Sequence, residues 1–175
     1  MKTSKTEFRN VILTIFTLTI AAFSYGQKMN QKEKLSFHSF SFTPEIFFID
    51  DFYAGGFGFT GDVSWVTKKD IFTFSVSVGE EFVIWGSADS FQQLNLLFGR
   101  ELMLKEWFFI DAHAGVGFLF YNTYDGHFTK IGMPLIVKMR FKTGDKFSIG
   151  PRLQANINSQ ISIYSAGLLL QWNYL

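Results

Sequence analysis

Residues 165–175, with the sequence SAGLLLQWNYL, decide the fold of this chain. Successive side chains of an extended strand point to opposite faces, so this stretch and the residue before it divide into two sets. One face is large and apolar, with aromatic residues near its end: Tyr164, Ala166, Leu168, Leu170, Trp172 and Tyr174. The other face is mostly small or polar: Ser165, Gly167, Leu169, Gln171 and Asn173. This alternation predicts a β-strand with one apolar and one polar face.

The same alternation recurs through the preceding sequence, and no stretch has a convincing helical period. Extended segments are predicted at 35–48, 54–66, 71–84, 90–104, 107–121, 131–141 and 147–157, before a final strand that follows Asn158-Ser159. The alternation slips at the start of the first segment, which predicts a β-bulge near His38. Eight such segments predict an all-β fold, an eight-stranded antiparallel up-and-down transmembrane β-barrel over residues 35–175.

The connections between these segments differ in length and charge. Those after the first, third and fifth segments are long and aromatic or acidic, and residues 122–130 are the longest. Those after the second, fourth and sixth segments are short and basic or contain Gly-Asp. Transmembrane barrels have short periplasmic turns and longer outer loops. An even number of strands then predicts that both termini are periplasmic.

A soluble lipocalin-like barrel would also alternate, but with its polar face outside. Here the polar face is built of Gly, Ser, Thr, Asn and Gln with few Lys or Glu, which favours a crowded lumen. Charges on the apolar face, Glu80 and Arg100, are expected near strand ends, where they cost little. Aromatic residues towards the segment ends are predicted to lie at the membrane interfaces: Trp65, Trp107, Tyr121, Tyr164, Trp172 and Tyr174.

The first residues predict export. Lys2, Lys5 and Arg9 precede an apolar run at 11–23, and Ser24-Tyr25-Gly26 suits cleavage before Gln27. The run has 13 residues, fewer than the roughly 20 that a membrane-spanning helix needs. We therefore predict a signal peptide at 1–26 and a short polar leader at 27–34. Cysteine is absent, which excludes disulfides, thiolate metal sites and a lipoprotein anchor, and a formal charge of +1 predicts no nucleic-acid partner.

Charged residues on the lumen face form the main candidate site. Those placed in the periplasmic half are three acids and three bases: Asp62, Glu101, Asp111, Lys138, Arg140 and Arg152. Glu45 and Glu81 are predicted to be acids of the upper lumen. Buried charges must be paired, and an eight-stranded barrel is barely wide enough for its own side chains. We expect a salt-bridge plug; the alternative is a narrow, selective pore for small solutes.

His113 lies two residues after Asp111 and so shares the lumen face with it. This spacing suits a base with its orienting acid, two metal ligands, or a histidine held in the lumen hydrogen-bond network. His38-Ser39 and His127 are further candidates for hydrolytic chemistry. Gly55–Gly58 and Gly115–Gly117 open no predicted helix, so they do not indicate a nucleotide site. We expect no metal and no cofactor.

The final strand, with its polar-x-Gly-x-x-apolar-x-aromatic pattern, resembles the C-terminal assembly signal of outer-membrane β-barrels. Residues 27–175 as a whole resemble the small eight-stranded barrels of Gram-negative bacteria, of OmpA/OmpX-like architecture, including the short barrel-domain proteins of Bacteroidota. One departure is Leu175, where the commonest members end in an aromatic residue.

This resemblance implies residence in outer-membrane lipid. It also implies assembly through periplasmic chaperones and the barrel-assembly machinery, and a structural or surface-interaction role. The class also contains lipid A deacylases and acyltransferases, which use histidine with serine at the outer rim. Their surrounding motifs are not visible here, so enzymatic activity stays an alternative and no catalytic residue is assigned.

Overall fold

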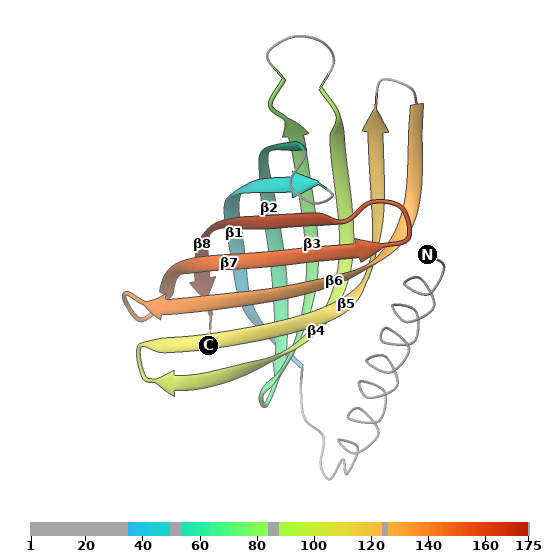
Figure 1. Cartoon of the computed structure of the whole chain (residues 1–175). Coiled ribbons are helices and arrows are strands. Elements are labelled where there is room, and N and C mark those ends of the chain that lie inside the picture. Colours follow the sequence, from blue (N-terminus) through green and yellow to red (C-terminus); the bar gives the residue numbers. More distant parts are fainter. Residues whose placement is uncertain (1–34, 50–53, 84–87, 124–125, 175) are drawn as a thin grey trace, which may run out of the picture. The chain divides into compact units, whose positions relative to one another are not determined.

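The computed structural model describes residues 35–49, 54–83, 88–123 and 126–174, and these residues form one closed β-barrel. The strands are β1 (Ser36–Ile49), β2 (Ala54–Thr67), β3 (Asp70–Glu81), β4 (Ser90–Lys105), β5 (Phe108–Thr123), β6 (Gly126–Lys142), β7 (Phe147–Asn158) and β8 (Ile163–Asn173). Each strand pairs antiparallel with its neighbour in sequence, and β8 pairs with β1. The predicted eight-stranded antiparallel barrel is therefore confirmed (Figure 1).

The predicted signal peptide and leader lie outside the described residues. Among the described residues, no helix is long and apolar enough to cross a membrane.

The two ends of the barrel differ in their connections. The β2–β3, β4–β5 and β6–β7 turns lie at the end where β1 begins and β8 finishes, which we call the terminal end (Figure 1). At the opposite end, which we call the loop end, lie the last residues of β1, β3, β5 and β7 and the first residues of β2, β4, β6 and β8. The start of β1 and the end of β8 thus lie at the same end of the barrel.

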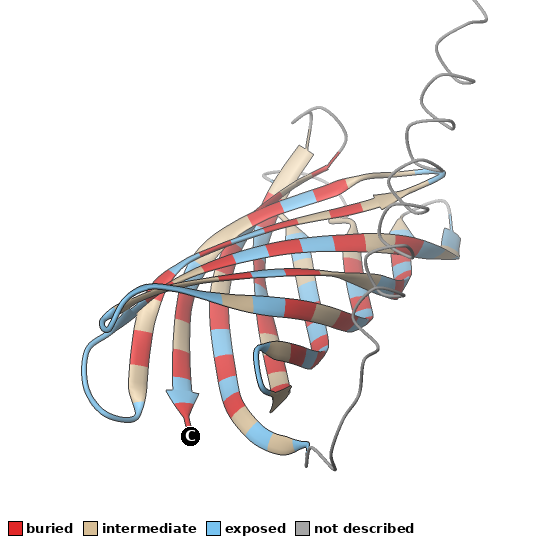
Figure 2. Ribbon diagram, turned by 90° about the horizontal axis from the view of Figure 1, so that it is seen from below, coloured by how far each residue is buried: buried red, intermediate tan, exposed pale blue. Residues whose placement is uncertain are grey.

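Burial alternates along almost every strand (Figure 2). Side chains on the outer wall are apolar and exposed, as in Phe72, Phe74, Val76 and Val78 of β3. Between them on β3, the lumen-facing side chains of Thr73, Ser75 and Ser77 are small, polar and buried. Because the polar set is buried and the apolar set is exposed, the barrel is the reverse of a water-soluble one.

The bulge at the start of β1 is present where the alternation slips. The register of the β1–β2 ladder shifts between Phe37 and Ser39. The carbonyl of His38 accepts a hydrogen bond from the Tyr174 amide at 2.9 Å, which connects the bulge to the residue directly after β8. The extra residue puts Ser39 and the alternate residues that follow it into the lumen.

Residues 122–130, predicted to be the longest loop, are instead mostly strand. β5 continues to Thr123 and β6 begins at Gly126, with Asn122 opposite His127 and Phe120 opposite Thr129. The prediction was wrong because this part of β6 alternates poorly: Gly126, His127 and Thr129 are all exposed. Backbone pairing with β5 extends the hairpin without needing an apolar pattern.

Candidate functional site in the barrel lumen

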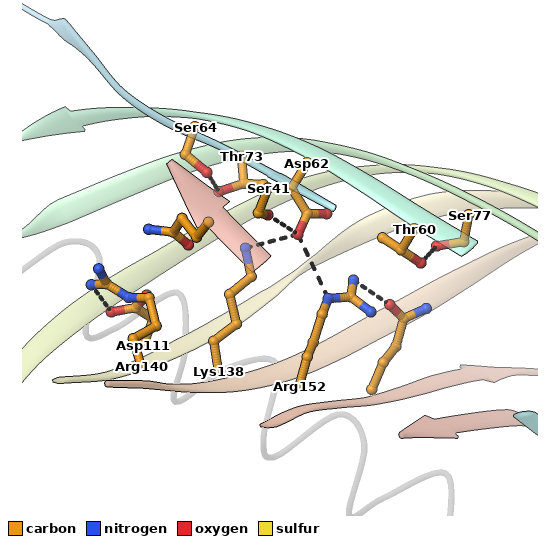
Figure 3. A network of polar contacts seen from close by, with 12 residues as sticks. Ser41, Thr60, Asp62, Ser64, Thr73, Ser77, Asp111, Lys138, Arg140 and Arg152 are labelled. Atoms are coloured by element: carbon orange, nitrogen blue, oxygen red, sulfur yellow. Dashed lines mark hydrogen bonds and ion pairs between the residues drawn. The ribbon is translucent and has the colours of Figure 1, made fainter. Parts of the chain in front are cut away.

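The centre of the lumen holds an ion-pair cluster around Asp62 of β2. Asp62 Oδ2 lies 2.8 Å from Lys138 Nζ and 3.6 Å from Arg152 Nε (Figure 3). Ser41 donates a hydrogen bond to the same oxygen at 3.1 Å. The Asp62, Lys138 and Arg152 side chains are at most 2% exposed. One carboxylate oxygen therefore links cations from β6 and β7 across the lumen to β2.

Arg152 extends this cluster to Glu45 of β1. Its Nη1 lies 3.0 Å from Glu45 Oε2, and its Nη2 donates to Gln154 Oε1 at 2.7 Å. Thr60 and Ser165 donate to the Glu45 carboxylate at 2.8 and 3.1 Å. The central cluster thus contains two acids and two bases, and its charges cancel.

A second cluster surrounds Arg140 of β6, nearer the terminal end. The guanidinium binds Asp111 through two hydrogen bonds, Nε to Oδ2 at 2.5 Å and Nη2 to Oδ1 at 2.8 Å. The same Nη2 also bonds to Glu101. Its carbon Cζ lies 5.2 Å from the Phe109 ring centroid, so the cation also lies over an aromatic ring. This cluster joins the neighbouring strands β4, β5 and β6 along one side of the lumen.

The two acids predicted for the upper lumen are separated by the structure. Glu45 belongs to the central cluster, since it bonds to Arg152. Glu81 lies at the loop end and is partly exposed, and its Oε1 is 3.5 Å from the Tyr121 hydroxyl. Which acid meets which base depends on the strand register, which the alternation within one strand does not fix.

Tyr121, predicted to be an interfacial aromatic, lies inside the barrel instead. It is only 4% exposed, and its hydroxyl donates to Asp89 at 3.0 Å. The physical reason is the two-residue period: Tyr121 is in phase with Asp111 and His113, which face the lumen. Of the other predicted girdle residues, Trp107, Tyr164, Trp172 and Tyr174 are exposed on the outer wall, and Trp65 is half-buried against Phe37.

The loop end of the lumen is filled by an apolar cluster that we did not predict. It consists of buried side chains from four strands, β1, β4, β5 and β8: Phe47, Ile49, Phe91, Leu119, Tyr121 and Ile163. Phe47 and Phe91 meet edge to face, with ring centroids 4.8 Å apart. A Cβ atom on Gly79 would lie 2.5 Å from the Phe91 ring, so glycine makes room for this pair. The sequence does indicate this cluster, because apolar residues occupy some of the alternate positions that otherwise carry lumen-facing polar residues. Phe47, two positions after Glu45, is one example.

Asp111 and His113 share the lumen face but do not form a dyad. The Asp111 carboxylate is bound to Arg140, and neither ring nitrogen of His113 has a hydrogen-bond partner. The His113 ring lies over Gly99, where an added Cβ would be 2.3 Å from it. His113 therefore fills space between β4 and β5, and its nitrogens are not oriented by an acid.

The other candidate histidines lie at opposite ends of the barrel. His38 is at the terminal end, beside the buried Ser39, and His127 is exposed at the loop end. Among the described residues, no group of three or more His, Asp or Glu side chains could hold a metal ion. His38, Arg140 and Asn173 line a pocket of about 240 Å³ at the terminal mouth of the lumen.

Comparisons with solved structures identify the class of this fold. The chain superposes on neisserial surface protein A with a TM-score of 0.62 and 6% identity, covering 81% of this chain and 100% of the other. It superposes on Ail of Yersinia pestis in complex with the heparin analogue sucrose octasulfate with a TM-score of 0.57 and 13% identity, covering 79% and 99%. It superposes on the N-terminal β-barrel domain of Pseudomonas aeruginosa OprF with a TM-score of 0.55 and 12% identity, covering 81% of this chain and 100% of the other.

These neighbours are small outer-membrane β-barrels, and at such low identity the likeness concerns the fold alone. No protein-family model matches the chain, and no curated protein sequence matches it either. The fold is thus that of the small eight-stranded outer-membrane barrels. The narrower resemblance to Bacteroidota barrel-domain proteins stays a prediction.

Proposed function

We propose that this protein is an integral barrel of the outer membrane with a closed lumen, acting as a structural or surface-interaction element of the envelope. The observation that carries the proposal is the inverted distribution of side chains. Aromatic and aliphatic residues are exposed on the outer wall, whereas paired charges are buried within the lumen. Hydrocarbon is the solvent that suits such a wall, and a closed barrel leaves no unpaired strand edge within it.

In this proposal the terminal end faces the periplasm and the loop end faces outward. The short turns at the terminal end support this orientation, because periplasmic turns are shorter than outer loops. The periplasmic chaperones and barrel-assembly machinery would act on the unfolded chain, and β8 would carry the assembly signal.

Membrane residence is tested by fractionating cells that express the full chain and by comparing gel migration before and after boiling. We expect the protein in the outer-membrane fraction and a faster-migrating band without boiling, since a folded barrel resists detergent. Recovery in the soluble periplasmic fraction would contradict the proposal.

A closed lumen supports the structural role over the small-solute pore. The polar middle is blocked by two ion-pair clusters and the loop end by the apolar cluster. We expect no stable open level when the purified barrel is inserted into planar lipid bilayers. Reproducible single-channel steps, absent from lipid-only membranes, would favour the pore instead.

A further inference from the structure

Exposed lysines gather at the terminal end of the barrel. Every described turn at this end carries at least one of them, in the turn or at the strand end beside it: Lys68, Lys69, Lys105, Lys142 and Lys146. Asp70 is paired with Arg100 at 2.8 Å, which leaves Glu106 and Asp145 as the acids of these turns. The five lysines therefore give this end a positive charge.

The loop end has the opposite charge in its described part. Glu80, Glu81 and Asp89 lie there, with Lys130 of β6 as a basic residue on the same half. The chain as a whole has a formal charge of only +1. The lysines are thus sorted to one end and do not reflect a generally basic protein.

Aromatic clusters on the outer wall mark the height of these lysines in a bilayer. Trp107 and Phe141 stack with their ring centroids 6.0 Å apart, beside the turns that carry Lys105 and Lys142. Lys105 Nζ lies 5.4 Å from the Trp107 ring centroid. Tryptophan and tyrosine concentrate at the headgroup level of membranes. A lysine stem can lie along the apolar wall there while its ammonium group reaches the phosphates.

We propose that these five lysines form a basic band that binds the headgroups of anionic phospholipids, such as phosphatidylglycerol, in the leaflet next to the terminal end. This proposal rests on the membrane residence proposed above. Clustered lysines beside a membrane surface attract anionic lipids over zwitterionic ones. Lys68 and Lys142 also line the mouth pocket, beside Glu101 and Asp145, so Lys69, Lys105 and Lys146 contribute most of the attraction.

The test uses the full-length barrel in vesicles of phosphatidylethanolamine and phosphatidylglycerol at a 3:1 ratio, about the simplest mixture that offers both headgroups. After mild detergent extraction, native mass spectrometry measures which lipids stay bound. We expect the retained lipid to be enriched several-fold in phosphatidylglycerol over the vesicle. In a variant with all five lysines replaced by glutamine, the retained lipid should have the same composition as the vesicle. In the variant with all five replaced by arginine, the enrichment in phosphatidylglycerol should remain. Lys130→Gln, at the other half of the barrel, is the matched control and should leave it unchanged.

The proposal would be overturned if the unmodified barrel retained the two lipids in the same ratio as the vesicle. It would also be overturned if phosphatidylglycerol stayed enriched after all five lysines were replaced by glutamine. A third outcome is that all barrels retain lipid in the vesicle ratio, while replacing the five lysines by glutamine abolishes binding to isolated peptidoglycan sacculi. That outcome would assign the lysines to the cell wall and reject the lipid proposal. Failure to insert, seen as lost heat-modifiable migration in vesicles of phosphatidylethanolamine alone, would instead overturn the membrane residence itself.

Discussion

At the residue scale, Asp62 is the point where the lumen network is most sensitive. One of its carboxylate oxygens forms ion pairs with both Lys138 and Arg152, and both cations are buried. Removing one partner of a buried ion pair leaves an uncompensated charge in a medium that solvates it poorly. The unpaired charge therefore lowers the free energy of unfolding of the whole barrel.

Lys138→Met should therefore lower the free energy of unfolding by about 3–5 kcal/mol, since two buried acids then share one arginine. Arg100→Met is the matched control: it breaks an ion pair whose side chains are 68% and 36% exposed, and exposed pairs contribute about 0–1 kcal/mol. Urea unfolding of the barrel in detergent micelles, followed by tryptophan fluorescence, measures both. Equal losses in the two variants would show that the central cluster is not energetically important.

The residues of this network could be identified from the sequence, but their partners could not. Asp62, Lys138 and Arg152 follow from the two-residue period of their own strands. Their meeting depends on how eight strands are staggered around the barrel, which is a non-local property. The same limit explains Glu45, whose partner Arg152 comes from β7. Tyr121 differs, because its phase with Asp111 and His113 is visible in the sequence and already indicates a position in the lumen.

At the element scale, the β5–β6 hairpin depends on one glycine. Gly126 begins β6 with φ of 146°, a conformation that residues with a side chain rarely adopt. Gly126→Ala should destabilise the barrel by about 1–3 kcal/mol, because the strain persists however much space surrounds the new methyl group. Gly144→Ala is a close control, since an added Cβ meets nothing within 4 Å at either glycine and only Gly126 has a positive φ.

Thermal or urea unfolding of the two variants decides the point. Gly144→Ala should be neutral or slightly stabilising, because alanine restricts the unfolded chain more than glycine does. A Gly126→Ala barrel as stable as the unmodified one would mean that this turn relaxes without cost.

The existence of the strands could be predicted from alternation, but their lengths could not always be. β4 and β7 match the predicted ranges within one residue, because Gln93 and Asn95 in β4, and Arg152 and Gln154 in β7, alternate with apolar residues. β6 extends towards the loop end where its alternation fails, since its partner β5 supplies the pairing. The part of a strand that its own sequence does not predict is thus the part stabilised mainly by pairing with the neighbouring strand.

At the scale of the whole molecule, the lumen is closed at two levels by different physical means. The apolar cluster at the loop end excludes water, and the ion-pair clusters fill the polar part beneath it. The chain contains no cysteine, so a single introduced thiol reports on access to any chosen depth.

Ser77→Cys places a thiol at a site that is 0% exposed, two residues below Gly79 on β3. In the otherwise unmodified barrel it should react with a charged, membrane-impermeant thiol reagent at least tenfold more slowly than Asn122→Cys at the exposed loop end. Adding Phe47→Ala and Phe91→Ala removes the two rings of the apolar cluster and should raise the rate at Ser77→Cys towards that of Asn122→Cys. Rapid labelling of Ser77→Cys before those changes would mean that the loop end is open.

The ladder between β1 and β8 has a consequence for the order of events in folding. Its residue pairs, such as Ser39 with Asn173 and Phe48 with Tyr164, come from opposite ends of the barrel sequence. Contacts between residues so far apart form slowly, because the intervening chain must first be organised. Neither β1 nor β8 has both of its neighbours until the last strand has been synthesised. Closure therefore cannot precede the synthesis of β8, and the chain must be kept from aggregating through its apolar strands until β8 is available.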